Sequence, residues 1–247
     1  MTLALRGLSV VVKQKYLVQD VNCELNTGQL IGLLGTNGAG KTSLLRAMAG
    51  LVNYSGSLQF NQTLLSKLTR TEYAKQVAYL AQKQPVHWAL SVEQVVGLGR
   101  IPHLSSWQTL TSTDQDIIYQ MMQQTETIDF AKRPVTELSG GEQARVLLAR
   151  AMAVQAPILL ADEPVTSLDP YHQLRVMELL QQYAEQGHLV IAVLHDFNLA
   201  ARFCQQILLL NQGQLVAQGT PQQVLTANNL MQVYQLSQQD LSYIQYD

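Results

Sequence analysis

Residues 30–42 read LIGLLGTNGAGKT, an apolar run followed by a glycine-rich turn that ends in lysine and threonine. The turn, residues 35–42, fits the complete G-x-x-x-x-G-K-[ST] pattern of a phosphate-binding P-loop. It follows a predicted strand and precedes the helix-forming SLLRAMAG (43–50), which is the context that the pattern requires. We therefore predict that nucleotide phosphates bind at this turn.

The residue types of the turn explain how it would bind phosphate. Glycines let the backbone curl so that several N–H groups point inward, and the dipole of the following helix adds positive potential there. Lys41 can reach the β- and γ-phosphates, and the Thr42 hydroxyl can bind Mg²⁺. The residues predicted to contact the nucleotide here are Gly35, Thr36, Asn37, Gly38, Ala39, Gly40, Lys41, Thr42 and Ser43.

Paired carboxylates follow a second apolar run. ILLADEP (158–164) is typical of a buried strand that ends in Asp162 and Glu163. Paired acids after a strand are often only a solvated loop, but the P-loop 121 residues upstream (162 − 41) favours catalysis. We predict that Asp162 holds Mg²⁺ through water and that Glu163 is the general base for the attacking water.

His195 comes directly after a third apolar run, LVIAVL (189–194). A lone histidine is usually structural. Open α/β sheets bind ligands beyond the carboxyl ends of their strands, so we predict that His195 contacts the γ-phosphate. The other histidines show no ligand spacing and are expected on the surface or in packing: His87, His103, His172 and His188.

A second glycine-rich helix start occurs at LSGGEQ (138–143). Ser139 and Glu142 form S-x-x-E, a capping box that stabilises any helix N-terminus. The capping box does not explain Gly140 and Gly141, because each glycine costs roughly 0.5–1 kcal/mol relative to alanine. Two in succession indicate that another group approaches this backbone closely. Free N–H groups at a helix start also bind anions, so the cap is compatible with a second phosphate site.

The chain alternates short Leu-, Ile- and Val-rich runs with longer segments of helical periodicity, as α/β proteins with buried parallel strands do. Residues 1–30 differ and resemble a half-exposed antiparallel sheet. Residues from about 85 to 150 are helical and interrupt the alternation, which indicates an inserted subdomain. The predicted parts are a nucleotide-binding α/β core, residues 1–82 and 151–225; a helical insertion, residues 83–150; and a C-terminal tail of unindicated role, residues 226–247.

The composition excludes several classes of function. A net charge of −2 argues against a protein held to nucleic acid by phosphate neutralisation, which needs a basic face. The apolar runs are shorter than the roughly 20 residues of a membrane span and no signal peptide is visible, so we expect a soluble chain. Cys23 and Cys204 have no metal-ligand spacing and are expected to be reduced thiols of a cytosolic protein.

The motifs resemble those of the ATP-binding-cassette (ABC) ATPases. GTNGAGKT, Gln82 in YLAQ, LSGGEQ, ILLADEP, SLD and His195 follow one another in the family's order, over nearly the whole chain. The resemblance implies a P-loop NTPase (RecA-like) core that binds ATP with Mg²⁺. It also implies two cassettes paired head to tail, each ATP lying between the P-loop of one subunit and Ser139, Gly140 and Gly141 of the other.

The resemblance also implies roles for individual residues. Gln82 resembles the lid residue that contacts Mg²⁺ and the attacking water and senses the transmembrane partner. Asp169 resembles the cross-dimer contact, and His195 the switch histidine. The implied catalytic residues are Lys41, Gln82, Glu163 and His195, and the implied metal-binding residues are Thr42, Gln82 and Asp162.

A closer resemblance lies in VVGLGRIPH (95–103) and in residues 193–225, which look like the ATPase subunits of importers for iron–siderophore complexes, haem and cobalamin. Gly99, Arg100, Pro102 and His103 could equally form a helix C-terminus and turn. The resemblance implies a homodimer on the cytoplasmic face of the inner (plasma) membrane, with permease subunits and, indirectly, a solute-binding protein, and without nucleic acid. The cargo is not identified, because specificity in this family rests with those other subunits.

The chain departs from the family pattern at three positions. Val12 stands where an aromatic ring usually stacks on adenine, with Tyr16 the nearest aromatic residue, while Val165 and Ala144 replace a threonine and a glutamine. No phosphate, metal or base residue is lost, so we expect an active ATPase.

Two alternatives to transport fit the motifs less well. Non-transport ABC proteins that act on ribosomes usually carry two cassettes, and those that act on DNA have long coiled coils between P-loop and signature. This chain has one cassette and 98 residues between those motifs (139 − 41), without heptads. A regulatory module without turnover would be missing the base, whereas Glu163 is present.

Overall fold

The computed structural model describes residues 1–82, 90–105 and 107–237. The start of the predicted insertion (83–89), which includes His87, and the end of the predicted tail (238–247) lie outside the described residues. The strands are β1 (Thr2–Val12), β2 (Lys15–Asn26), β3 (Gln29–Leu34), β4 (Ser55–Phe60), β5 (Thr63–Leu64), β6 (Val77–Leu80), β7 (Ile158–Ala161), β8 (Leu189–Val193), β9 (Gln206–Asn211) and β10 (Gln214–Gly219).

Helices connect and cover these strands. The α-helices are α1 (Lys41–Met48), α2 (Arg70–Gln76), α3 (Val92–Gly97), α4 (Ser112–Gln124), α5 (Gly140–Ala153), α6 (Pro170–Glu185), α7 (Phe197–Phe203), α8 (Pro221–Val224) and α9 (Ala227–Tyr234). Short 3₁₀ helices are Leu65–Lys67, Leu98–His103, Ile128–Phe130 and Val135–Glu137.

The central sheet of the described chain has the order β10-β9-β3-β8-β7-β6. All its neighbours pair in parallel except β10, which is antiparallel to β9. Alternate residues of each strand join different hydrophobic clusters: in β3, Leu30 and Leu34 face one side, and Ile31 and Leu33 face the other. Both faces of the parallel part of this sheet are therefore buried, which explains the continuous apolar runs of its strands, whereas the antiparallel edge strand β10 is partly exposed.

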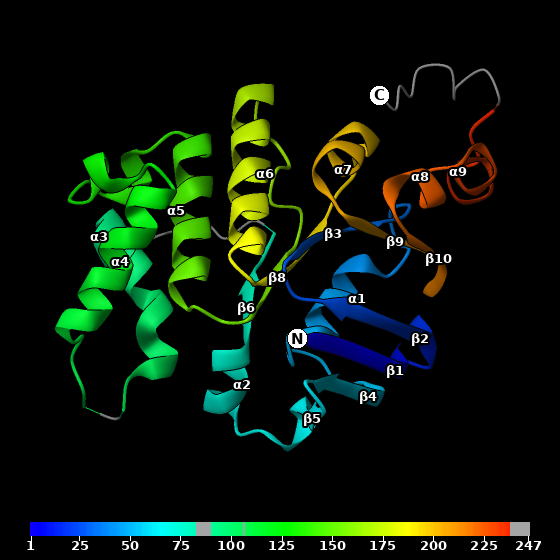
Figure 1. The fold of residues 1–247 in the computed structure, drawn as a ribbon, viewed down its shortest axis with the longest axis horizontal. Coiled ribbons are helices and arrows are strands. Elements are labelled where there is room, and N and C mark those ends of the chain that lie inside the picture. Colours follow the sequence, from blue (N-terminus) through cyan, green and yellow to red (C-terminus); the bar gives the residue numbers. More distant parts are fainter. Residues whose placement is uncertain (83–89, 106, 238–247) are drawn as a thin grey trace.

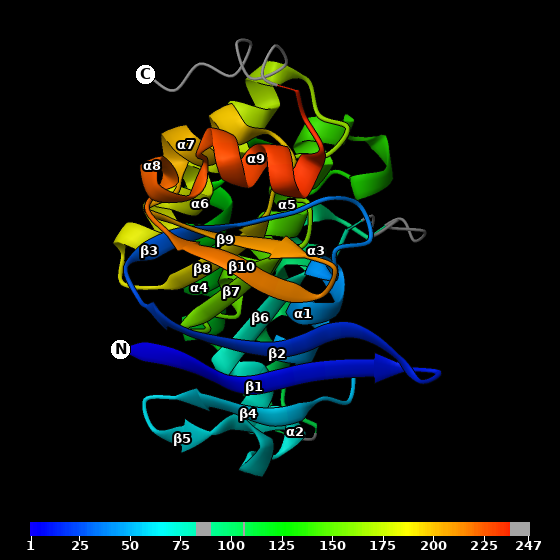
Figure 2. The same cartoon turned by 90° about the vertical axis from the view of Figure 1, so that its right-hand side faces the viewer.

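One face of the central sheet is covered by α1 and a second, antiparallel sheet of order β2-β1-β4-β5. Figure 2 shows β1, β2 and β4 below α1 and the central strands. The antiparallel sheet extends beyond the expected residues 1–30, because β4 pairs with β1 from Leu3↔Phe60 to Ser9↔Ser55. The start of β2 lies beside the P-loop, because the Leu17 carbonyl oxygen faces Gly40.

The other face carries α3 to α9, whereas Tyr73 of α2 packs against the cluster on the α1 side. Helices α3, α4 and α5 pack on one another to the left in Figure 1, with α6 between them and the rest of the sheet in that view. Val95 of α3, Ile118 of α4 and Val146 of α5 share one buried cluster with the sheet. The helical region and the sheet thus have a continuous core.

The motif GLGRIPH (97–103) holds the C-terminal end of α5. Arg100 Nη1 donates to the Ala153 carbonyl at 2.8 Å, and His103 Nε2 lies 2.8 Å from the Val154 carbonyl. Arg100 Nε also forms a buried ion pair with Asp114 at 2.8 Å. A Cβ atom at Gly99 would lie 2.2 Å from the Arg150 carbonyl oxygen, so the backbones touch there. These residues therefore cap a neighbouring helix as well as ending α3.

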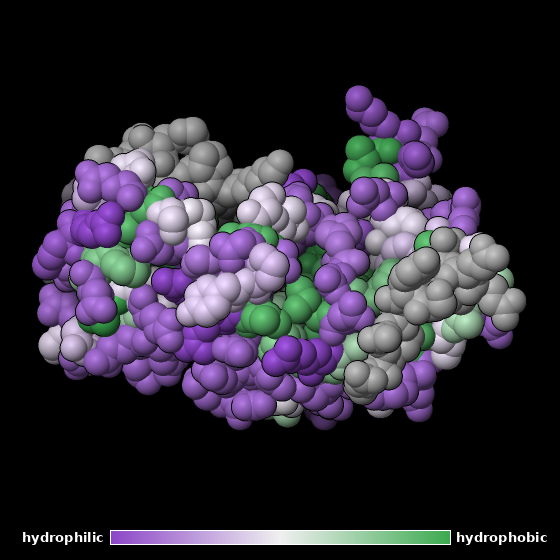
Figure 3. Space-filling view, turned by 90° about the horizontal axis from the view of Figure 1, so that it is seen from above, coloured by the Kyte–Doolittle hydropathy of each residue, from purple (hydrophilic) through white to green (hydrophobic). Residues whose placement is uncertain are grey.

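Three further observations concern the helices, the surface and the cysteines. Within the described residues, every helix is too short or too polar to cross a bilayer. Figure 3 shows one face on which hydrophilic residues predominate and hydrophobic atoms form separate patches. Cys23 and Cys204 are free and buried, and burial raises the pKa of each thiol to about 12.

Candidate functional site

The predicted catalytic residues meet at one edge of the central sheet. The P-loop follows β3, His195 follows β8, Asp162 and Glu163 follow β7, and Gln82 follows β6. Because the sheet has the order β3-β8-β7-β6, the carboxyl ends of these parallel strands are neighbours. A cavity of about 550 Å³ at this edge is lined by Asn37, Gln82, Glu163 and His195, among others.

The P-loop backbone requires glycine at two positions. Gly40 caps α1 at φ 101°, and a Cβ atom there would lie 2.2 Å from the Leu17 carbonyl oxygen. Gly35 has φ 146°, and its Cβ atom would lie 2.3 Å from the Leu210 carbonyl oxygen. The loop is therefore pressed between β2 and β9. A cavity of about 210 Å³ lies beside it, lined by the loop, Leu17 and Glu163.

The Lys41 ammonium group spans the loop. Its Nζ donates to the carbonyl oxygens of Gly35 at 2.7 Å and Thr36 at 3.0 Å, and the residue is only 6% exposed. Burial lowers the pKa of Lys41, although the negative charges of Glu163 and Asp162 oppose that shift. A cation held this way can exchange loop carbonyls for phosphate oxygens.

Asp162 is buried between the P-loop helix and β6. Its Oδ1 accepts from the Thr42 hydroxyl at 3.0 Å, and its Oδ2 accepts from the Tyr79 hydroxyl at 3.0 Å. Burial raises the pKa of Tyr79 to about 12, so Tyr79 keeps its proton and remains a donor. Sequence reasoning missed Tyr79, whose position in YLAQ was visible but whose partner was not.

Glu163 is surrounded by donors. Its Oε1 lies 2.9 Å from His195 Nε2, and its Oε2 accepts from the Thr166 hydroxyl at 3.0 Å and from the Gln82 amide. Burial alone would raise the pKa of Glu163, but hydrogen bonds from His195 and Thr166 and the charges of His195 and Lys41 outweigh it. The pKa of Glu163 therefore lies below its usual value, and the group is ionised at neutral pH.

The second glycine-rich helix start forms the capping box that the sequence predicts. Ser139 is the N-cap of α5, its Oγ accepts from the Glu142 amide at 3.3 Å, and Glu142 Oε2 accepts from the Ser139 amide at 2.8 Å. Hydrogen bonding to Ser139 lowers the pKa of Glu142. A Cβ atom at Gly140 would meet nothing within 4 Å, so the helix start is open there. Figure 1 shows α5 well separated from the P-loop helix α1.

Asp169 caps α6, and both of its carboxylate oxygens contact His172. Its Oδ1 accepts from the His172 amide at 3.0 Å, and its Oδ2 lies 2.8 Å from His172 Nδ1. These contacts, the backbone hydrogen bond first, lower the pKa of Asp169. The carboxylate side chain is still 59% exposed, so it remains available at the surface.

The aromatic residue near the expected adenine position does not line the phosphate cavity. Tyr16 is 55% exposed and Val12 is 47% exposed, whereas Leu17 lines the cavity beside the P-loop. Tyr16 and Leu17 are neighbours in β2, and successive strand residues point to opposite faces. Leu17, rather than Tyr16, is therefore the residue of β2 that lines the cavity beside the P-loop.

Tyr234 lies in the C-terminal tail, for which the sequence indicated no role, and it contacts the start of the P-loop. Its hydroxyl accepts from the Gly35 amide at 2.8 Å, and its ring meets the Phe197 ring edge-on, with centroids 4.8 Å apart. Phe197 begins α7, two residues after His195. Burial raises the pKa of Tyr234 to about 12, although the Gly35 hydrogen bond opposes that shift. No local sequence pattern indicated this contact.

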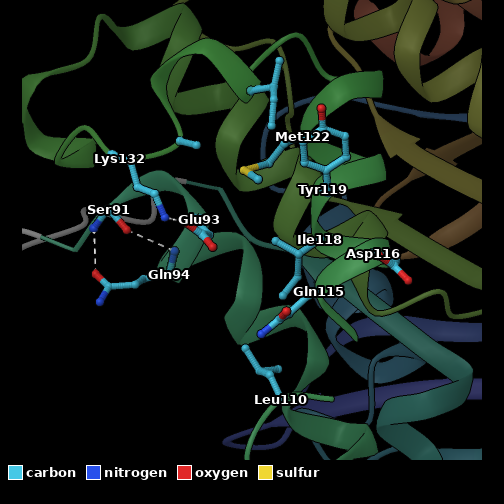
Figure 4. Close-up of a pocket in the computed structure, with 12 residues that line it drawn as sticks. Ser91, Glu93, Gln94, Leu110, Gln115, Asp116, Ile118, Tyr119, Met122 and Lys132 are labelled. Carbon is cyan, nitrogen blue, oxygen red and sulfur yellow. Dashed lines mark hydrogen bonds and ion pairs between the residues drawn. The ribbon is translucent and has the colours of Figure 1, made fainter. Parts of the chain in front are cut away.

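A larger cavity of about 850 Å³ lies in the helical region, between α3 and α4 (Figure 4). Its lining includes Gln94, Tyr119, Met122 and Lys132, which Figure 4 draws around an open space. None of the residues predicted to bind nucleotide lines this cavity, so it is separate from the candidate site.

Comparison with known sequences identifies the family. A family model described as "ABC transporter" matches residues 18–166. The hemin import ATP-binding protein of Pseudomonas entomophila is 40% identical over 238 residues, 94% of this chain and 92% of that protein. The iron(3+)-hydroxamate import ATP-binding protein of Bacillus subtilis is 34% identical over 237 residues, 95% of this chain and 88% of that protein.

The cobalamin import ATP-binding protein of Halobacterium salinarum is 39% identical over 232 residues, which are 93% of this chain. The match spans only 58% of that longer protein.

Solved structures agree with the sequence relatives. A metal-chelate type ABC transporter in an inward-facing conformation superposes with a TM-score of 0.84 and 28% identity, covering 95% of this chain and 89% of that one. A dimeric bacterial ABC transporter cassette superposes with a TM-score of 0.76 and 26% identity, covering 89% of this chain and 98% of that one.

The chain therefore belongs to the ABC transporter family. The predicted P-loop α/β fold is confirmed, as is the predicted resemblance to import ATP-binding proteins for hemin, iron-hydroxamate and cobalamin.

Proposed function

We propose that this chain is the ATP-binding and ATP-hydrolysing subunit of an ABC importer. The observation that carries the proposal is the position of Glu163. This ionised carboxylate lines the same cavity as Lys41 and Thr42 and is held there by His195, Thr166 and Gln82. A base beside a phosphate cradle is the arrangement that hydrolysis of a nucleoside triphosphate requires.

The residues divide the chemistry between them. Lys41 exchanges the Gly35 and Thr36 carbonyls for the β- and γ-phosphates, and the inward N–H groups of the loop bind the remaining phosphate oxygens. Glu163 accepts a proton from the attacking water, and His195 orients Glu163 and contacts the γ-phosphate. Gln82, whose amide already contacts Glu163, reports the state of the site to the adjoining helical region.

The oxygen atoms at this edge fit Mg²⁺. The Thr42 hydroxyl donates to Asp162 Oδ1 at 3.0 Å, so the hydroxyl oxygen would bind Mg²⁺ and the neighbouring carboxylate would hold the ion through water. Within the described chain, His, Cys, Asp and Glu side chains form no cluster able to hold a metal alone. That suits Mg²⁺, which is usually shared between one or two protein oxygens and the phosphates. Bound Mg²⁺ would neutralise charge that develops on the phosphates.

We propose that two copies pair so that Ser139, Gly140 and Gly141 of one copy complete the site begun by the P-loop of the other. Three observations support this arrangement: the open backbone at Gly140, the separation of α5 from α1, and a dimeric relative. Asp169 remains exposed and would contact the partner copy.

The relatives indicate the class of cargo. Relatives that are 34–40% identical over the aligned residues are import ATP-binding proteins for hemin, iron-hydroxamate and cobalamin, and all of these cargoes are metal chelates. We propose that this chain energises uptake of such a chelate from the cytoplasmic face of the inner (plasma) membrane, through permease subunits and a solute-binding protein. The net charge of −2 favours such partners over ribosomal RNA or DNA.

ATP turnover and sedimentation of wild-type protein and Glu163→Gln test the proposal. We expect the Glu163→Gln variant to bind ATP, to hydrolyse it at least about a hundredfold more slowly than wild type, and to accumulate as an ATP-bound dimer. The reason is that the neutral glutamine amide cannot accept the proton from water. Glu185→Gln, at an exposed position of α6, is the matched control and is expected to behave as wild type.

Near-normal hydrolysis by Glu163→Gln would remove Glu163 from the role of base. Co-purification from membranes tests the transport part separately. A permease that binds this chain is the expected result, whereas stable association with ribosomes or DNA would overturn it.

A further inference from the structure

The second glycine of the LSGGEQ motif is blocked from within the same protomer. A Cβ atom at Gly141 would lie 2.2 Å from His172 Cδ2, 2.5 Å from Cγ and 2.6 Å from Nε2. At Gly140, one residue earlier, a Cβ atom would meet nothing within 4 Å. The two glycines therefore meet different needs: Gly140 leaves the helix start open, and Gly141 admits the edge of the His172 imidazole ring.

The opposite edge of that ring is bonded to Asp169. His172 Nδ1 lies 2.8 Å from Asp169 Oδ2, and the His172 amide donates to Asp169 Oδ1 at 3.0 Å. A carboxylate only accepts hydrogen bonds, so Nδ1 carries the proton in this contact. The neighbouring Tyr171 ring meets the imidazole edge-on, with centroids 5.2 Å apart. One ring thus contacts two segments that are distant in sequence.

We propose that His172 is a positioning residue that fixes the Asp169 loop and the Ser139–Gly140 helix start as one rigid surface. This inference rests on the proposed head-to-tail pairing, in which both segments face the partner copy. Gln173 strengthens the unit, because its Nε2 donates to the Leu168 carbonyl at 3.0 Å and ties the same loop to α6. Movement of α6 then carries both partner-facing segments together, so cross-dimer contact and completion of the ATP site occur in one step.

A pair of alanine substitutions tests the contact itself. Gly141→Ala places a methyl group inside the His172 ring and is expected to lower the thermal midpoint of the isolated protomer. In a His172→Ala background, Gly141→Ala is expected to lower the thermal midpoint much less, because the space for the methyl group is then free. Gly140→Ala is the matched control, and its effect is expected to be the same in both backgrounds. If Gly141→Ala lowers the thermal midpoint equally in both backgrounds, the proposed contact between Gly141 and His172 is wrong.

Two further variants test the positioning role. His172→Phe keeps a ring against Gly141 but loses the donor to Asp169, and His172→Asn keeps a donor but loses most of the ring. For both we expect ATP turnover to fall roughly tenfold or more, with unchanged ATP affinity of the isolated protomer, because only the cross-dimer geometry is altered. Wild-type turnover from either variant would overturn the role of His172. Failure of wild-type protein to hydrolyse ATP would instead count against the proposed function, since the thermal measurement needs neither nucleotide nor dimer.

Discussion

Glu163 shows how strongly single residues are constrained at this site. Its φ of 53° lies in the left-handed region that residues other than glycine rarely adopt, at a cost of order 1–3 kcal/mol. Contacts with His195, Thr166 and Gln82 hold the side chain despite that cost. Strained residues of this kind concentrate at active sites, and the strain here falls on the proposed base.

Gly35 is held through both of its backbone polar groups. Lys41 binds its carbonyl oxygen, and Tyr234 accepts from its amide. Tyr234 therefore stabilises the first turn of the P-loop at the place where the chain leaves β3.

Tyr234→Phe tests this contact, because it removes the hydroxyl and keeps the ring against Phe197. A part-buried amide that loses its partner costs at least about 1 kcal/mol, so we expect about a fivefold weaker ATP affinity in the isolated protomer. Titration with ATP measures this directly. Tyr119→Phe, at a half-exposed position of α4, is the control. Equal affinity for Tyr234→Phe and wild-type protein would contradict the prediction.

Helix α5 is secured differently at its two ends. Its N-terminus is an exposed capping box, whereas its C-terminal carbonyls are bound by Arg100 and His103. Arg100 is in turn fixed by Asp114, which also caps α4 with Thr111. The helix that carries Ser139 is therefore anchored at its far end to α3 and α4.

The Asp114 carboxylate gives this anchor a pH dependence. Hydrogen bonds from Thr111, and then from Arg100, lower the pKa of Asp114 from 3.8 to about 2. A depressed carboxylate pKa stabilises the folded state fully above the unfolded value, and that stabilisation is lost as the pH falls from about 3.8 toward 2.

We expect Asp114→Asn to lower the unfolding free energy by roughly 3 kcal/mol at pH 7, because Arg100 is left buried without its charge partner. The difference from wild type is expected to narrow below about pH 4. Urea unfolding at pH 7, 5 and 3 measures both effects, with the exposed Asp129→Asn as control. A difference that stays constant from pH 7 to 3 would show that ionisation of Asp114 does not contribute.

At the scale of the whole molecule, the proposed pairing builds each ATP site from two protomers, with the P-loop of one and the Ser139 helix start of the other. Mixing two inactive variants tests whether two protomers together form one complete ATP site. Ser139→Arg keeps the P-loop and loses the helix start, and Lys41→Ala does the reverse. Each alone is expected to be inactive, while an equal mixture recovers up to about a quarter of wild-type turnover, because half the dimers then contain one complete site.

The control for this mixture is a single chain that carries both substitutions, which is expected to remain inactive with either partner variant added in equal amount. If the mixture of the two single variants shows no more ATP turnover than the sum of the separate variants, each protomer completes its own site. ATP turnover at a protein concentration that favours dimers is the measurement.

Features that depend on neighbouring residues could be predicted from the sequence. The P-loop, the capping box at Ser139 and the doubly buried strands each rest on hydrogen bonds or side-chain periodicity within a few residues. The ends of apolar runs also located Asp162, Glu163 and His195 at one sheet edge, because parallel strands share their direction. The family then followed from the order of these motifs.

Contacts between distant segments were decided only by the tertiary structure. Tyr234 lies 199 residues from Gly35, and His172, expected merely on the surface or in packing, fits against Gly141 while it binds Asp169. Leu17, rather than the nearby aromatic Tyr16, lines the cavity beside the P-loop. The physical reason is the same in each case: a local pattern sets a residue's own backbone and the face on which it lies. Which other segment packs against that face depends on the strand order and on helix packing, in which the whole chain takes part.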